Sequence, residues 1–164
     1  MSGEKPKLTH VDDQGRPRMV DVTEKHETLR CAVAEGHIRM SPEALSAIRS
    51  GTSPKGDVLQ VARIAAITGG KRTSDLIPLC HALPGVSLTV DVRADDELPG
   101  VRIRAEAKVS GQTGVEMEAI TAVSLGLVTV YDMVKAVDRG MIIGGVKLVS
   151  KEGGKSGSWS ADQS

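Results

Sequence analysis

The sequence predicts an α+β domain in which helices pack on one face of an antiparallel sheet. Residues 86–94 and 101–109 alternate apolar and polar side chains, which is typical of half-buried strands. The turn-forming residues 95–100 lie between them and favour an antiparallel hairpin with one polar face. Residues 113–138 form one long, mostly apolar segment, which predicts a helix that is buried on most sides.

Two shorter helices are predicted before the hairpin. Ser41 is followed by a proline and an acidic residue, a pattern typical of a helix start, and Gly51 is the expected end of this helix. A second helix is expected to begin near Asp57, because apolar side chains then recur on one stripe. Gly69 and Gly70 are expected to interrupt it.

The long helix is expected to begin with a capping box formed by Thr113 and Glu116. Further strands are expected over residues 28–40, with a bulge at Gly36, and over residues 142–150. The resulting order of strand, helices, strand, strand, helix and strand suits a ferredoxin-like sandwich.

The composition limits the class of protein. The 164 residues suit one domain, and the 21 basic residues balance the 21 acidic ones, so bulk binding of nucleic acid is not expected. One Trp, one Tyr and no Phe argue against a base-stacking surface. The two cysteines, Cys31 and Cys80, lie far apart, which argues against a Cys-rich zinc site and a disulfide scaffold.

The chain is predicted to have three parts. Residues 1–7 are expected to be a disordered lead, residues 8–151 a single catalytic domain, and residues 152–164 a flexible tail rich in Gly and Ser. No signal peptide and no stretch long enough to span a bilayer is recognised. We therefore expect a cytoplasmic protein with reduced thiols and no membrane partner.

Two charges stand in the apolar long helix. Asp132 and Lys135 are three residues apart and so share one face. They are interpreted either as a structural ion pair or as part of a site, because an unpaired buried charge is costly. Lys55 precedes the second helix, where a free helix N-terminus favours a phosphate, although a solvated lysine is the simpler interpretation.

A second set of candidates lies in a proline-bounded loop and at the start of the long helix. His81 suits phosphate binding or acid–base chemistry, whereas Cys80 is interpreted as a small buried hydrophobic residue and not as a nucleophile. Glu116 has a capping role, which leaves Glu118 as the better site candidate. The four histidines show no metal-ligand spacing, so no metal site is expected.

Several short motifs follow one another along the chain. They are Met19–Val22, Lys55–Val58, Lys71–Thr73, Leu76–His81, Thr113–Ala119, Tyr131–Met133 with Lys135–Ala136, and Gly153–Gly157. Taken in this order, they resemble the motifs of one family, the cyclic pyranopterin monophosphate synthases (molybdenum cofactor biosynthesis protein C, or MoaC). The similarity runs from about Leu8 to Gly157, with two departures, at Ala82 and Val134.

The resemblance implies a ferredoxin-like fold and a hexamer, a trimer of dimers, with sites at subunit interfaces. It implies a lyase that converts 3′,8-cyclo-7,8-dihydroguanosine 5′-triphosphate, supplied by a radical-SAM GTP cyclase, into cyclic pyranopterin monophosphate and pyrophosphate. No tightly bound cofactor is implied, and Mg²⁺ is expected only through the substrate phosphates. A non-catalytic module that senses nucleotides or pterins is the alternative, because this fold serves many functions.

The resemblance also implies roles for particular residues. Asp132, Lys135 and Lys55 correspond to the catalytic positions. Because apolar residues flank Lys135, we also expect its pKa to be lowered. The implied substrate-binding residues are Asp21, Arg30, Leu79, Cys80, His81, Glu116, Met117, Glu118 and Lys151. Independently of the resemblance, the glycine-rich segment 151–157 suggests that Lys151, together with Lys155, closes over the substrate phosphates only when substrate binds. A solvated tail with no role is the alternative interpretation.

Overall fold

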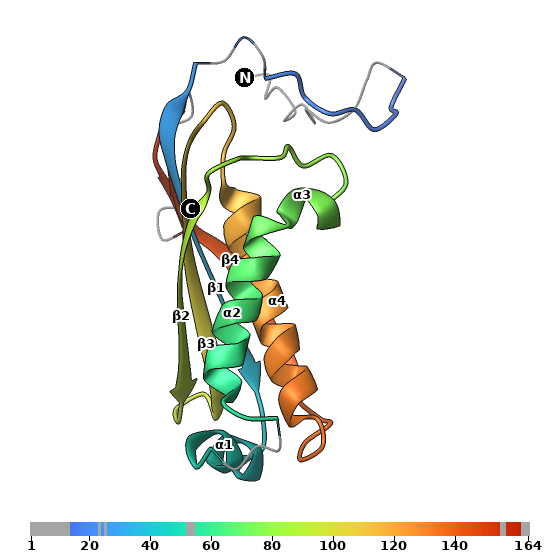
Figure 1. Ribbon diagram of the computed structural model, residues 1–164, viewed down its shortest axis with the longest axis vertical. Helices are drawn as coiled ribbons and strands as arrows, with labels where there is room; N and C mark the ends of the chain where they lie inside the picture. Colours follow the sequence, from blue (N-terminus) through green and yellow to red (C-terminus); the bar gives the residue numbers. More distant parts are fainter. Residues whose placement is uncertain (1–13, 23, 25, 52–54, 155–156, 162–164) are drawn as a thin grey trace, which may run out of the picture.

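The computed structural model describes residues 14–22, 24, 26–51, 55–154 and 157–161. The expected disordered lead, residues 1–7, and Lys155 lie outside these ranges. The elements follow the order β1 (Thr28–Arg39), α1 (Pro42–Arg49), α2 (Val58–Lys71), α3 (Thr73–Leu76), β2 (Ser87–Asp95), β3 (Gly100–Gly111), α4 (Glu116–Val134), β4 (Ile142–Glu152) and β5 (Trp159–Ser160) (Figure 1).

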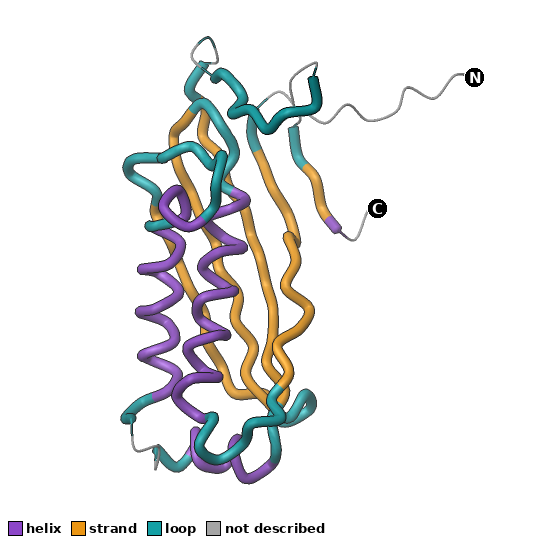
Figure 2. The backbone as a smooth tube through the Cα atoms, turned by 90° about the vertical axis from the view of Figure 1, so that its right-hand side faces the viewer, coloured by secondary structure: helices purple, strands orange, loops and turns teal. Residues whose placement is uncertain are grey.

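The five strands form one antiparallel sheet in the order β2-β3-β1-β4-β5. Helices α2 and α4 lie side by side on one face of this sheet, and none of the helices in the described residues covers the opposite face (Figure 2). This arrangement confirms the predicted α+β fold with helices packed on one face of the sheet. The short strand β5, which pairs with the end of β4, was not expected within the Gly/Ser-rich tail.

The core lies between the sheet and helix α4. Small side chains, including Ala34 and Ala105, face α4 from the central strands and are fully buried. Gly36 interrupts the pairing of β1 with β4, which confirms the predicted bulge. A Cβ atom on Gly36 would lie 2.9 Å from side chains of Val123 and Val146, so glycine permits close packing there. The close approach of helix and sheet explains how the core forms with so few aromatic residues.

Helix α4 is apolar and long enough to be a membrane-span candidate by length and composition alone. In this structure it packs as a core helix, with ten of its residues buried against α2 and the sheet. The expected capping box is wrong. The N-cap position is Val115, no side chain caps the helix there, and Glu116 is engaged in an ion pair with Lys151 instead.

Helix α2 runs without interruption through Gly69 and Gly70, so the break expected at these residues is wrong. The reason is tertiary packing. A Cβ atom on Gly70 would lie 2.6 Å from the Cδ1 atom of Leu88, and one on Gly69 would lie 2.8 Å from Leu125. The two glycines therefore serve close contact of α2 with β2 and α4 and do not end the helix.

We expect Gly70→Ala to lower the free energy of unfolding by about 1–3 kcal/mol, because the added methyl group overpacks a tight contact. Gly111→Ala is the matched control, since a Cβ atom there meets no atom closer than 3.5 Å. Urea denaturation monitored by circular dichroism measures both changes. A loss at Gly70 no larger than that at Gly111 would contradict the packing explanation.

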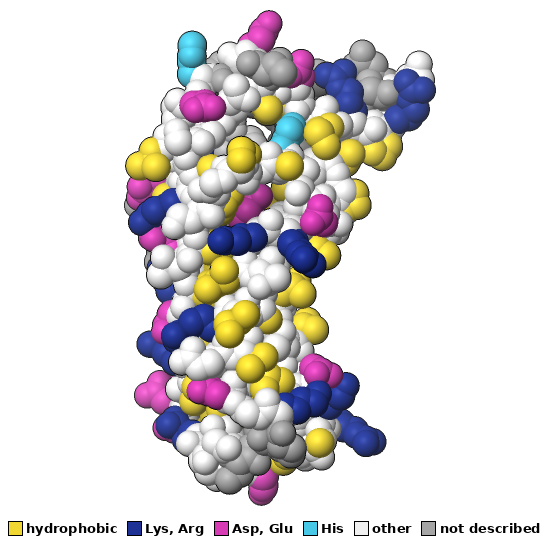
Figure 3. Space-filling view, viewed as in Figure 1, with side chains coloured by type: hydrophobic (Ala, Val, Ile, Leu, Met, Phe, Trp, Pro, Cys, Tyr) yellow, Lys and Arg dark blue, Asp and Glu magenta, His cyan; other side chains and the backbone are white. Residues whose placement is uncertain are grey.

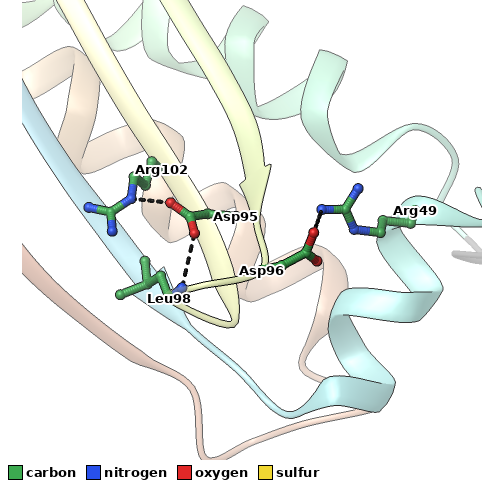
Figure 4. A network of polar contacts seen from close by, with 5 residues as sticks. All are labelled: Arg49, Asp95, Asp96, Leu98 and Arg102. Carbon is green, nitrogen blue, oxygen red and sulfur yellow. Dashed lines mark hydrogen bonds and ion pairs between the residues drawn. The ribbon is translucent and has the colours of Figure 1, made fainter.

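The β2–β3 turn is fixed by polar contacts (Figure 4). Asp95 pairs with Arg102 and accepts a hydrogen bond of 2.9 Å from the backbone N–H of Leu98. Asp96 forms an ion pair with Arg49 of α1 at 2.8 Å. The hydrogen bonds from Arg102 and from the backbone hold the pKa of Asp95 below its usual range. These contacts connect α1 to the hairpin at one end of the sheet.

Candidate functional site

Three of the predicted site residues meet at the C-terminal end of α4. The Nζ atom of Lys55 lies 2.7 Å from Oδ2 of Asp132, and the Nζ atom of Lys135 lies 2.7 Å from Oδ1. Lys55 also donates a hydrogen bond of 3.1 Å to the backbone carbonyl of Asp132. One carboxylate thus holds two ammonium groups, and we call these three residues the Asp132 cluster.

The electrostatics of the Asp132 cluster differ from the sequence-based expectation. Hydrogen bonds from Lys135 and then Lys55 lower the pKa of Asp132 to about 2. The hydrogen bond to Asp132 raises the pKa of Lys135, so the expected lowering is wrong for the single subunit. The two side chains are each 53% exposed, and burial therefore does not remove the lysine charge. The arrangement supplies a protonated lysine, that is, a proton donor.

The lowered pKa of Asp132 predicts an acid-dependent contribution to stability. A carboxyl whose pKa is depressed in the folded state contributes stability above the unfolded pKa of about 3.9, and this contribution is lost as the pH falls towards 2. The difference in Tm between the wild type and Asp132→Asn should therefore narrow from about pH 4 to pH 2. When Lys55 and Lys135 are both replaced by methionine, the effect of Asp132→Asn on Tm should no longer change with pH over this range. A Tm difference that stays constant over this range would contradict the assignment.

A second group of predicted residues surrounds a pocket at the other end of α4. The pocket has a volume of about 460 Å³ and lies between the 77–83 loop and the first turn of α4, with Leu79, Cys80, His81, Glu116 and Met117 in its lining. We call these five residues the His81 pocket. Ile77, Pro78 and Leu83 make much of the remaining lining apolar.

The loop that carries His81 is held in an unusual conformation. Leu79 has a φ of 65°, in the left-handed region that residues other than glycine rarely adopt. The Nε2 atom of His81 lies 2.8 Å from the carbonyl oxygen of Val20, which brings the segment containing Asp21 next to the loop. Burial, and then the charge of Glu118, raise the pKa of the Cys80 thiol, which favours the interpretation of Cys80 as a packed side chain.

Arg30, Glu116 and Lys151 line a smaller cavity of about 100 Å³ beside the His81 pocket. Lys151 forms an ion pair of 3.0 Å with Glu116, and Arg30 donates hydrogen bonds of 2.9 and 3.1 Å to the carbonyl groups of Gly111 and Gln112. Lys151 lies within β4 and is paired with Glu116. Its closure over the substrate phosphates stays a prediction.

Glu118 does not line the His81 pocket. Its side chain is 3% exposed and contributes to a separate pocket of about 420 Å³, on the side of the loop that faces α2 and α3. Burial raises the pKa of Glu118, and the nearby charge of Glu116 raises it further. The other polar residues that line this pocket are Lys71, Thr73 and Ser74, which were not among the predicted site residues. Lys71 and Thr73 belong to one of the quoted motifs, which was the signal that could have found them.

The predicted site residues therefore form two groups in one subunit. Met117 and Asp132 are fifteen residues apart on α4, which corresponds to about 22 Å along the helix axis. The first turn of α4 and its C-terminal end lie at opposite ends of the helix layer (Figure 1). One subunit does not bring the Asp132 cluster and the His81 pocket together. Among the described residues, no group of three or more His, Cys, Asp or Glu side chains is placed to bind a metal ion.

Comparison with known proteins decides the family. The family model of the MoaC family matches residues 19–154, which is most of the chain and includes both groups of residues. The chain belongs to the MoaC family. A MoaC relative from Cereibacter sphaeroides (strain KD131 / KCTC 12085) is 57% identical over 154 residues, which cover 94% of this chain and 97% of the relative.

A second MoaC relative, from Brucella ovis, is 55% identical over 159 residues, which cover 97% of this chain and 94% of the relative. Both relatives carry the name cyclic pyranopterin monophosphate synthase. The chain is therefore a member of an enzyme family, and a role as a non-catalytic sensing module is not favoured.

Proposed function

We propose that this protein is a cyclic pyranopterin monophosphate synthase of molybdenum cofactor biosynthesis. The substrate is 3′,8-cyclo-7,8-dihydroguanosine 5′-triphosphate, which a radical-SAM GTP cyclase supplies, and the products are cyclic pyranopterin monophosphate and pyrophosphate. Two observations support this function: the names of relatives that match nearly the whole chain, and the three-residue cluster of one carboxylate between two lysines.

The Asp132 cluster suits both halves of this reaction. Opening and reclosing the heterocyclic ring needs proton transfers, and Lys135 carries a proton that it can donate. Formation of the cyclic phosphate expels pyrophosphate when an oxygen of the sugar-derived skeleton attacks the α-phosphorus. The negative charge that grows on the leaving group is stabilised by cations, a role that we assign to Lys55; its ion pair with Asp132 supports this assignment. A phosphorus–oxygen bond breaks in this reaction without the addition of water, so the enzyme is classed as a lyase.

We propose that the complete site forms between subunits of a hexamer, a trimer of dimers. The separation of the Asp132 cluster from the His81 pocket supports this arrangement. Apolar side chains exposed on the helix layer also support it (Figure 3), among them Val61 and Ile64 on α2 and Val128 on α4. Exposed apolar surface of this kind favours contact with another subunit. Light scattering should give a mass several times 17.2 kDa.

No nucleic acid, membrane or tightly bound cofactor takes part in the proposed reaction. Mg²⁺ acts through the substrate phosphates. Elemental analysis that finds one zinc or iron per chain would contradict the absence of a resident metal. Both cysteines, Cys31 and Cys80, are free thiols, which fits the cytoplasm as the proposed location.

The proposed function is tested by incubating the purified protein with 3′,8-cyclo-7,8-dihydroguanosine 5′-triphosphate. Pyrophosphate and cyclic pyranopterin monophosphate should appear in equal amounts. A folded, assembled protein that releases neither product from this substrate would contradict the proposal.

A further inference from the structure

The single tryptophan of the chain lies beside the cavity of Arg30, Glu116 and Lys151. Trp159 belongs to β5, which extends the sheet at its outer edge next to β4 (Figure 2). In the antiparallel pairing of these two strands, Trp159 stands directly opposite Lys151. Residues opposite each other in such a pair place their side chains on the same face, with Cβ atoms about 4.5–5.5 Å apart.

The indole of Trp159 lies on the face of the sheet that carries the helices. Lys151 points to this face, because its Nζ atom forms the ion pair of 3.0 Å with Glu116 in the first turn of α4. The side chain of Trp159 therefore lies on the same side. Trp159 is 38% exposed, so part of a broad aromatic surface is open to solvent next to Lys151.

Two glycines after β4 connect this part of the chain to the cavity. Gly153 and Gly154 have φ values of 97° and 71°, in the left-handed region. A Cβ atom on Gly153 would collide with the carbonyl oxygen of Leu29, and one on Gly154 would collide with the guanidinium group of Arg30. Both positions therefore require glycine, and the turn that leads towards Trp159 packs directly on the arginine of the cavity.

The cavity and the indole together match a phosphate joined to a flat ring. Arg30 and Lys151 are the cations of the cavity and suit a phosphate group. The cavity volume of about 100 Å³ is too small for a heterocycle, so an attached ring has to lie outside it, on the side where Trp159 is exposed. A chain with so few aromatic residues offers no extended stacking surface, but one indole is sufficient for one ring.

We propose that Trp159 contacts the substrate, and that its indole stacks on the heterocycle while Arg30 and Lys151 hold a phosphate group. This inference rests on the proposed function, in which the substrate joins a guanine-derived ring to a triphosphate. Stacking needs no particular pattern of hydrogen-bond donors, so the contact persists while the ring system rearranges. Trp159 is a binding residue in this scheme and moves no proton.

Fluorescence and calorimetry test the stacking with two ligands, GTP and inorganic triphosphate. The chain contains one Trp, so tryptophan emission reports on this position alone. GTP should quench the emission of the wild type to saturation, whereas inorganic triphosphate should leave it nearly unchanged. Trp159→Ala should bind GTP at least about fivefold more weakly, as expected for the loss of one stacking contact, and inorganic triphosphate as tightly as the wild type. Trp159→Phe, which keeps an aromatic ring, should recover part of the affinity for GTP.

Ser160→Ala is the matched control and should keep the affinity for both ligands, because Ser160 belongs to the same strand but faces the other side of the sheet. An equal loss of affinity for both ligands in Trp159→Ala would overturn the inference, since it would show that Trp159 only supports Lys151. So would unchanged binding of GTP by Trp159→Ala, or wild-type emission that does not respond to GTP. Turnover of the cyclised substrate by the wild type tests the proposed function separately.

Discussion

Asp132→Asn is expected to reduce turnover at least about a hundredfold, within the range that a positioned proton-transfer group contributes. The carboxylate holds the ammonium groups of Lys55 and Lys135 at 2.7 Å each. Asparagine is uncharged and offers one oxygen, so it cannot hold both lysines or offset their mutual repulsion. Both lysines then lose their position relative to the substrate phosphates and the ring.

Lys135→Ala should cause a loss of similar size, because it removes the proton donor itself. The measurement is pyrophosphate release from the cyclised substrate under saturating conditions. Lys147→Ala is the matched control, since Lys147 pairs with Glu35 on β1, away from the Asp132 cluster, and its loss should leave turnover near the wild-type rate. Each variant should keep the oligomeric mass of the wild type. Near-normal turnover by an assembled Asp132→Asn or Lys135→Ala variant would contradict the catalytic assignment.

Most of the fold could be predicted, because the patterns that specify its elements involve residues close together in the sequence. The hairpin of β2 and β3 follows from strict alternation and turn chemistry, and the bulge follows from Gly36 in a strand that alternates less regularly. The capping box failed because Glu116 binds Lys151, a residue distant in sequence. The expected interruption of α2 failed for the same kind of reason, since Gly69 and Gly70 are required by contacts with other elements.

The candidate site was predicted less completely than the fold. The sequence places Asp132 and Lys135 on one face of a helix, and the structure confirms that they are paired. Their exposure in one subunit could not be predicted, because the apolar character of α4 suggests burial on all sides. The direction in which Glu118 points was also not predictable, since Met117 and Glu118 are adjacent yet line different pockets.

The second large effect concerns the proposed sharing of the site between subunits. Asp132→Asn and His81→Ala should each be nearly inactive alone, because each removes one of the two groups that the reaction needs. When the two variants are produced together, their subunits should form mixed assemblies. A shared site takes the Asp132 cluster from one subunit and the His81 pocket from another. It is intact when the first subunit has kept Asp132 and the second has kept His81.

Turnover by assemblies that contain Asp132→Asn and His81→Ala subunits in equal numbers tests the shared site most directly. With random mixing, about a quarter of the sites are intact, so about a quarter of the wild-type rate should return. A mixture of Asp132→Asn and Lys135→Ala subunits is the matched control and should stay inactive, because both changes damage the same cluster. If the first mixture is as inactive as the control, each site lies within one subunit and the shared site is wrong.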